Sequence, residues 1–144
     1  MRCGCLCSLP SAFVSRHRRE VAFAASPTML RFWCATPAAL VALKRAAFGR
    51  RTHEGVAIER DYHDAFQLLA AVGLEIVQEL ATVDDPGLTM QVRAAAEDLA
   101  DGGHATERAA RERVKLNLAA TERAAEREIV REARLFLRDL ESGA

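Results

Sequence analysis

The sequence predicts a mainly α-helical fold: a small helical domain with at most one or two short edge strands, a long C-terminal helix and a disordered N-terminal leader. Hydrophobic residues make up 50% of the chain but aromatic residues only 6%, and alanine supplies much of the rest, which favours close-packed helices over a β-sandwich. Apolar residues recur at helical spacing in 58–69 and 88–99. Residues 104–140 contain no glycine or proline.

The distribution of charge divides the chain into segments. The 144 residues carry a formal net charge of zero, so charge alone does not indicate a nucleic-acid-binding protein. Residues 1–33 hold five arginines against one glutamate, 34–103 hold six basic against eleven acidic residues, and 104–144 hold nine against eight. We expect a leader over 1–28, a helical domain over 29–103, and a long helix rich in alanine, arginine and glutamate over 104–144.

The leader shows no sustained hydrophobic period and is expected to be disordered. Its Cys3, Cys5 and Cys7 could bind a soft metal, but no second ligand cluster follows, so no metal site is predicted and the role of these thiols stays open. The run Arg16-His17-Arg18-Arg19 is expected to be solvated. The apolar runs are too short for a secretory signal or for the ~20 residues of a membrane span, so we expect a cytoplasmic protein with no membrane contact.

One edge strand is expected at 29–35. Leu30, Phe32 and Cys34 alternate with Arg31, a pattern that suits a strand with one buried face. The same residues could instead be an apolar segment that leads into the following helix.

Five helices are expected to follow. The first begins at Thr36 and Pro37, because threonine caps a helix and proline at the first position lacks only an N–H that would have no helical partner. Gly49 is expected to end it. Glycine, proline and aspartate separate the others. The expected helices cover 38–48, about 56–70, 74–82, 88–100 and 104–140, with a break at 71–73, a loop at 52–55 and a turn at 84–87.

The last expected helix has a thin apolar stripe and many arginines. Its C-terminal half, which includes Ile129 and Phe136, should pack either on the protein's own core or on a second copy, so 114–140 is a candidate for self-association. Arg127 lies four residues from an arginine on either side. Such like-charge pairs do not stabilise an isolated helix.

Lys44 is the first candidate for chemistry. It shares a helix face with Leu40 and Ala47, so it either extends out of the core edge or points into a polar pocket. A lysine ammonium acts as a point charge, which suits a phosphate.

Two carboxylates follow on the next helix. Asp61 and Asp64 are three residues apart, so they share one side of that helix. Such a pair can hold Mg²⁺, one member can act as a base, or both can simply favour the positive end of the helix dipole. Arg60 beside them could pair with one carboxylate at the surface. The sequence contains no Walker-type glycine-rich loop, no G-x-S-x-G and no zinc pattern.

Two segments together resemble a known family. They are Ala35-Thr36-Pro37-Ala38-Ala39-Leu40-Val41-Ala42-Leu43-Lys44 and, after a basic loop, Arg60-Asp61-Tyr62-His63-Asp64-Ala65-Phe66-Gln67-Leu68-Leu69. Over about 34–83 the chain resembles the C-terminal half of the AbiEii-type nucleotidyltransferase toxins. Those proteins have a strand, a helix with a lysine near its end, and a further helix with an R-D-x-x-D-like motif.

The resemblance implies transfer of a nucleoside monophosphate from a nucleoside triphosphate to an RNA or protein acceptor, in several relatives a tRNA end. Lys44 would contact the triphosphate. Asp61 or Asp64 would support the site or the acceptor, and Arg60 would orient them. The family's metal site is a G-S motif followed by D-x-D, and this sequence has no G-S before Lys44 and no D-x-D. Mg²⁺ and the nucleotide are therefore expected only with a missing N-terminal half, and the truncated chain is expected to be inactive alone.

The alternative hypothesis is a small helical protein–protein interaction module without enzymatic activity. The partners to consider are a cognate antitoxin, the missing N-terminal half, a tRNA acceptor by resemblance, and a second copy bound through 114–140.

Overall fold

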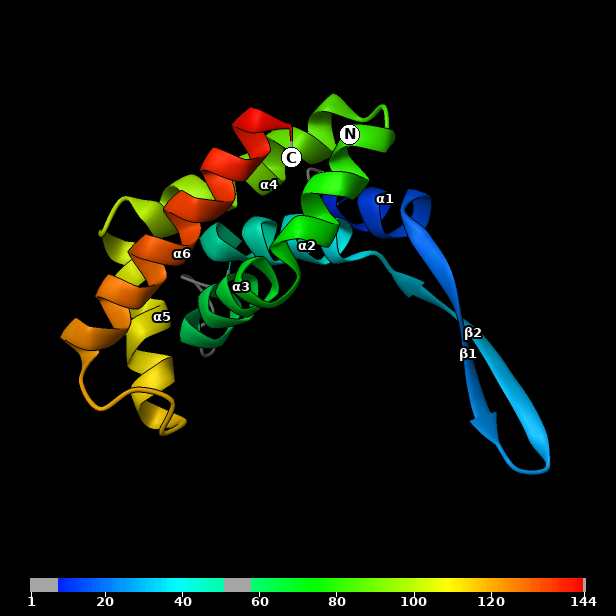
Figure 1. Cartoon of the computed structure of the whole chain (residues 1–144), viewed down its shortest axis with the longest axis horizontal. Coiled ribbons are helices and arrows are strands. Elements are labelled where there is room, and N and C mark those ends of the chain that lie inside the picture. Colours follow the sequence, from blue (N-terminus) through cyan, green and yellow to red (C-terminus); the bar gives the residue numbers. More distant parts are fainter. Residues whose placement is uncertain (1–7, 51–57, 144) are drawn as a thin grey trace, which may run out of the picture.

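The computed structural model describes residues 8–50 and 58–143 and confirms the mainly helical fold. Helices form one bundle, from which a two-stranded hairpin projects (Figure 1). The expected loop at 52–55 and the cysteines at positions 3, 5 and 7 lie outside the described residues. The elements are α1 (Ser8–Arg16), β1 (Arg18–Ala25), β2 (Thr28–Ala35), α2 (Pro37–Arg50), α3 (Ile58–Thr82), α4 (Pro86–Ala100), α5 (His104–Lys115) and α6 (Glu122–Ser142).

The segment expected to be a disordered leader is folded from Ser8 onward. Helix α1 packs against α2 and buries Phe13. Strand β1 pairs antiparallel with β2, in a register that runs from Arg18 opposite Ala35 to Ala25 opposite Thr28. The prediction for 8–28 was wrong because pairing with a second segment, not a hydrophobic period within one, orders β1.

Strand β2 confirms the expected strand but not its buried face. Leu30 and Phe32 are exposed, because the hairpin extends away from the helices and no described element covers it (Figure 1). Helix α2 begins as expected, with Thr36 Oγ1 accepting a hydrogen bond from Ala39 N at 3.3 Å. Gly49 does not end it, because one glycine costs a helix only about 1 kcal/mol, and α2 continues to Arg50.

Helix α3 joins the two helices expected at 56–70 and 74–82. Val72, inside the expected break, has non-helical dihedral angles (φ −131°, ψ 27°), so two helical segments meet there at a kink, which confirms the break. A Cβ added at Gly73 would lie 3.2 Å from the Phe136 ring. The glycine therefore lets α6 approach α3 closely at the bend.

The single helix expected over 104–140 is two helices. The chain reverses between α5 and α6, where Asn117 takes a left-handed conformation (φ 57°) that asparagine tolerates. Thr121 then starts α6, its Oγ1 accepting a hydrogen bond from Ala124 N at 3.1 Å. Propensity favoured one helix, but these two polar residues supply the turn and the cap.

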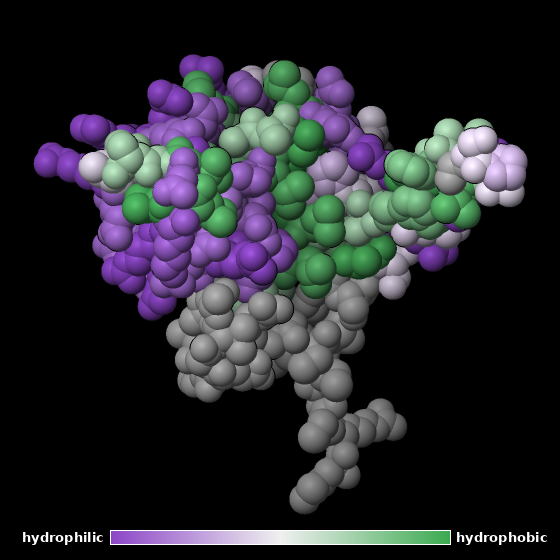
Figure 2. Space-filling model, turned by 90° about the horizontal axis from the view of Figure 1, so that it is seen from below, coloured by the Kyte–Doolittle hydropathy of each residue, from purple (hydrophilic) through white to green (hydrophobic). Residues whose placement is uncertain are grey.

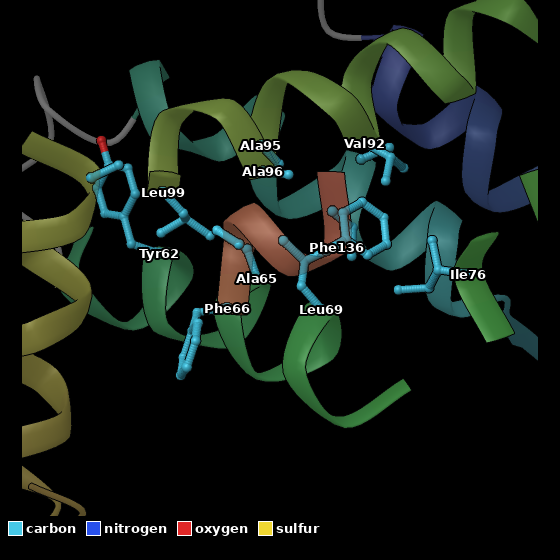
Figure 3. Close-up of a cluster of buried hydrophobic side chains, with 14 of the residues drawn as sticks. Tyr62, Ala65, Phe66, Leu69, Ile76, Val92, Ala95, Ala96, Leu99 and Phe136 are labelled. Carbon is cyan, nitrogen blue, oxygen red and sulfur yellow. The ribbon is translucent and has the colours of Figure 1, made fainter. Parts of the chain in front are cut away.

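The core lies where α3, α4 and α6 meet (Figure 3). Ile129 and Phe136 are buried in it, so the apolar stripe of α6 packs on the protein's own core. Thr106 is also buried and donates a hydrogen bond to the Leu99 carbonyl at 2.9 Å. The labelled core side chains are Tyr62, Ala65, Phe66, Leu69, Ile76, Val92, Ala95, Ala96, Leu99 and Phe136.

Candidate functional site

The lysine and the two aspartates that the sequence singled out lie together between α2 and α3. Lys44 Nζ donates hydrogen bonds to Asp61 Oδ1 at 3.1 Å and to Asp64 Oδ2 at 2.7 Å. The two carboxylates are one helical turn apart on α3 and meet the lysine from the same side. The result is an ion-pair cluster that joins two neighbouring helices.

The three residues of this cluster, Lys44, Asp61 and Asp64, are buried to different degrees. Asp61 is 2% exposed, whereas the side chains of Lys44 and Asp64 are 29% and 38% exposed. Burial alone lowers the pKa of Lys44, but hydrogen bonds and charge from Asp64 and Asp61 outweigh it and raise this pKa above its ordinary value. The lysine therefore stays protonated and extends along the core edge to polar partners.

The chemistry of the cluster follows from its donors and acceptors. An ammonium group has three N–H donors, so two carboxylates leave Lys44 one donor for a further acceptor, such as a phosphate oxygen. Within the described residues, no three histidine, cysteine or acidic side chains are grouped as metal ligands. Asp61 and Asp64 already have Lys44 as their counterion, so they do not by themselves fit Mg²⁺, which needs six oxygen ligands.

Arg60 lies outside this cluster. Its side chain is exposed, while the adjacent Asp61 is buried. The structure therefore brings three of the four expected residues together and leaves Arg60 at the surface of α3.

His63 is a buried residue that sequence reasoning did not find. It lies one turn from Phe66 in the protein interior, and among the described residues its Nε2 has no hydrogen-bond partner. Burial and the charge of Arg113 lower the pKa of His63, against smaller opposite effects of Asp64 and Glu112. The imidazole is therefore neutral at pH 7. Its i,i+3 spacing from Phe66 was the signal in the sequence.

In the basic run 16–19 the three arginines are exposed, as expected, and only His17 is partly buried. His17 Nε2 lies 2.7 Å from Asp85 Oδ2, and Arg16 lies 3.3 Å from the same oxygen. Asp85 also caps α4, accepting a hydrogen bond from Leu88 N at 3.1 Å. The hydrogen bond from His17, together with that backbone bond and Arg16, lowers the pKa of Asp85 despite its partial burial. Arg19 pairs with Glu75 on α3 at 2.6 Å.

The hairpin carries a second candidate surface. From its register, Val21 lies opposite Phe32 and Phe23 opposite Leu30, and these two pairs share one face of the hairpin. Phe23 is 60% exposed and Phe32 47%. In Figure 2 the hairpin and the middle of this side of the molecule are hydrophobic, while the α5–α6 end is hydrophilic. On the other face of the hairpin, Arg18 stacks over the Trp33 ring at 5.1 Å.

Helix α3 has a further property. Over Glu59–Thr82 it is long and apolar enough, by length and composition alone, to cross a membrane. Most of its large apolar residues, including Phe66 and Ile76, lie in the core of the bundle, whereas Leu74 is exposed; this burial is compatible with a soluble protein. The cytoplasmic location stays a prediction.

The structure thus has two candidate sites: the ion-pair cluster of Lys44, Asp61 and Asp64 at the edge of the core, and the exposed apolar face of the hairpin. Comparisons with protein-family models, with curated proteins and with solved structures found no match to this chain.

Proposed function

We propose that this chain is the C-terminal portion of a nucleotidyltransferase-like toxin, which transfers a nucleoside monophosphate from a nucleoside triphosphate to an RNA or protein acceptor. The observation that carries the proposal is the convergence of Lys44, Asp61 and Asp64 from two helices. These are the residues to which the resemblance to the AbiEii-type family gives a role. The chain is inactive alone, because the residues that would hold Mg²⁺ belong to a separate part.

Lys44 is suited to bind the triphosphate. Its charge is fixed by a raised pKa, and one N–H donor is left for a phosphate oxygen. Positioning and charge neutralisation supply most of the catalysis in phosphoryl-type transfer. In this role Asp61 and Asp64 are positioning residues that hold the ammonium in place.

The hairpin supports a two-part arrangement. A two-stranded sheet is marginally stable in water by itself, and among the described residues no third strand pairs with β1 or β2. Its outer edges offer backbone N–H and C=O groups, and its apolar face needs a cover. Strands from the missing half would satisfy both needs.

The second candidate function is an interaction module without enzymatic activity. The exposed hairpin favours it, since an open strand edge binds any partner that adds a strand, a cognate antitoxin included. Self-association through the apolar stripe within 114–140 is less favoured, because Ile129 and Phe136 are buried within the fold.

The test is to supply the missing part. The full chain is co-expressed with an N-terminal half that carries G-S and D-x-D, the complex is purified, and transfer of radiolabelled nucleotide to total RNA and to protein is measured. We expect transfer by the complex and a loss of at least about a hundredfold in Lys44→Met, because a positioned charge contributes this much to such reactions.

Two variants separate catalysis from folding. Lys44→Met/Asp61→Asn removes both charges of the buried pair, so it should fold but stay inactive. Lys115→Met removes the surface pair between α5 and Glu59 on α3 (3.1 Å) and should leave transfer unchanged. A complex that forms and transfers equally well without Lys44 would refute the enzymatic proposal. A complex that forms through the hairpin without any transfer would favour the interaction module.

A further inference from the structure

The outer side of α6 carries a stripe of arginines. All the basic residues of this helix are exposed, and they follow one another at spacings of four, four, three and four. At 3.6 residues per turn they fall within a sector of about 80° on the side opposite the core residues Ile129 and Phe136. The arginine stripe consists of Arg123, Arg127, Arg131, Arg134 and Arg138.

No acidic residue of α6 lies within the sector of the stripe between its first and last arginine, and of the six acids of this helix only Glu126 lines the same groove. Glu128 faces α5, where it accepts two hydrogen bonds from Arg113 at 3.0 and 3.1 Å. Glu132 borders a different groove, next to the bend of α3. Within the described residues, three members of the stripe have no ion pair, and the other two pair only with the next residue in sequence. Such exposed pairs contribute little to stability because solvent screens them.

The stripe also borders a groove. Val130, Leu135, Gly102 and one acidic residue, Glu126, line it together with four of the arginines, and it encloses about 650 Å³. Planar guanidinium groups along an apolar groove suit a ligand that offers regularly repeated oxyanions. In the isolated protein the like-charge i,i+4 pairs destabilise α6, and a bound polyanion would reverse that effect.

We propose that the outer side of α6 binds the phosphodiester backbone of a nucleic acid. The stripe spans fifteen residues, or about 22 Å, which matches about six nucleotide steps at ~3.4 Å each along a duplex strand. Evenly spaced cations with no acidic residue between them on that side favour a polymer of regular charge over an acidic protein surface. The net charge conceals this stripe because α6 itself also carries six acidic residues, most of which lie on its other sides. The arginine stripe includes neither Lys44 nor the hairpin, so its binding to nucleic acid is tested independently of the proposed function.

The experiment measures the salt dependence of binding. Fluorescein-labelled oligonucleotides of about 20 nucleotides, as single-stranded RNA, single-stranded DNA and duplex DNA, are titrated with the full chain between 50 and 200 mM KCl, and anisotropy is recorded. Five phosphate contacts predict a slope of log K against log salt of about −3.5 for single strands and about −4.5 for the duplex. Tighter binding of RNA than of DNA would identify the 2′-hydroxyl as a further contact.

A matched pair of variants locates the surface. Arg127→Gln/Arg131→Gln/Arg134→Gln should fold, reduce the single-strand slope by about 2, and weaken binding at 50 mM KCl by at least about tenfold. The control variant makes the same change in net charge elsewhere, with Arg31→Gln/Arg93→Gln/Arg111→Gln, and should keep the slope. Circular dichroism checks the helix content of both.

Three results would overturn the proposal. The first is no anisotropy change with any oligonucleotide at 50 mM KCl. The second is equal weakening by the two triple variants, which would indicate unspecific attraction to net charge. The third is concentration-dependent self-association in sedimentation velocity that only the stripe variant loses, without oligonucleotide binding, which would assign the surface to a second copy.

Discussion

The helical bundle and the hairpin use the same kinds of side chains in opposite ways. Phe136 in the bundle is 3% exposed, whereas Phe32 in the hairpin is 47% exposed. The bundle also places a charged pair, Lys44 and Asp61, at the edge of its core, while the hairpin pair Arg31 and Glu20 is exposed at 3.7 Å. The difference indicates that the bundle supplies the stability of the protein and that the hairpin supplies a surface for something else.

Removing an aromatic ring from each region should give the largest contrast. Phe136→Ala leaves a cavity between α3 and α6 and should cost about 3–5 kcal/mol of unfolding free energy. Phe32→Ala should cost less than about 1 kcal/mol, because no core forms around that ring. Urea unfolding followed by circular dichroism measures both. Similar costs would show that the hairpin belongs to the cooperative core after all.

Removing a cation from each region should give a smaller contrast. Lys44→Met leaves Asp61 buried without its counterion and should cost about 3 kcal/mol, the lower end of the range for buried pairs because Lys44 is partly exposed. Lys44→Met/Asp61→Asn should recover most of that loss. In the hairpin, Arg31→Gln should cost less than about 0.5 kcal/mol. An unchanged midpoint for Lys44→Met in urea would exclude the cluster as a link between α2 and α3.

The smallest effect should come from pH and should be confined to the bundle. The pKa of His63 is lowered in the folded state, so the unfolded state binds the proton more readily. Stability should be complete above pH ~6.5 and fall below it, by at most about 1.4 kcal/mol per pH unit. His63→Gln should flatten the dependence between pH 5 and 7. Asp85, whose pKa is lowered, and Lys44, whose pKa is raised, lose their contributions only well below and well above this range. A slope that persists in His63→Gln would assign the effect to another group.

Sequence reasoning succeeded where the signal was local. The cap at Thr36, the break near Val72, and the shared helix side of Asp61 and Asp64 all follow from spacings within one helix. Such signals depend on the 3.6-residue period and on capping chemistry, which act over a few residues.

It failed where distant segments decide the structure. Strand β1 has no apolar period of its own, and only its pairing with β2 orders it. The reversal between α5 and α6 rests on Asn117 and Thr121. The high helix propensity of the residues around them hides this turn signal in the sequence. His63 is buried on α3, which packs against α5, and the charge that acts on it comes from Arg113 on α5, fifty positions away. Neither composition nor period records such contacts.

The attachment of the hairpin to the bundle matters for any partner that binds the hairpin. Two contacts fix it to the bundle, the His17–Asp85 contact at 2.7 Å and the Arg19–Glu75 pair at 2.6 Å. The Thr36 N–H closes the base by donating a hydrogen bond to the His17 carbonyl at 3.0 Å. Because these contacts reach α3 and the start of α4, they hold the hairpin in one orientation relative to the bundle. A partner that binds the hairpin therefore also meets the helices of the bundle in a fixed orientation.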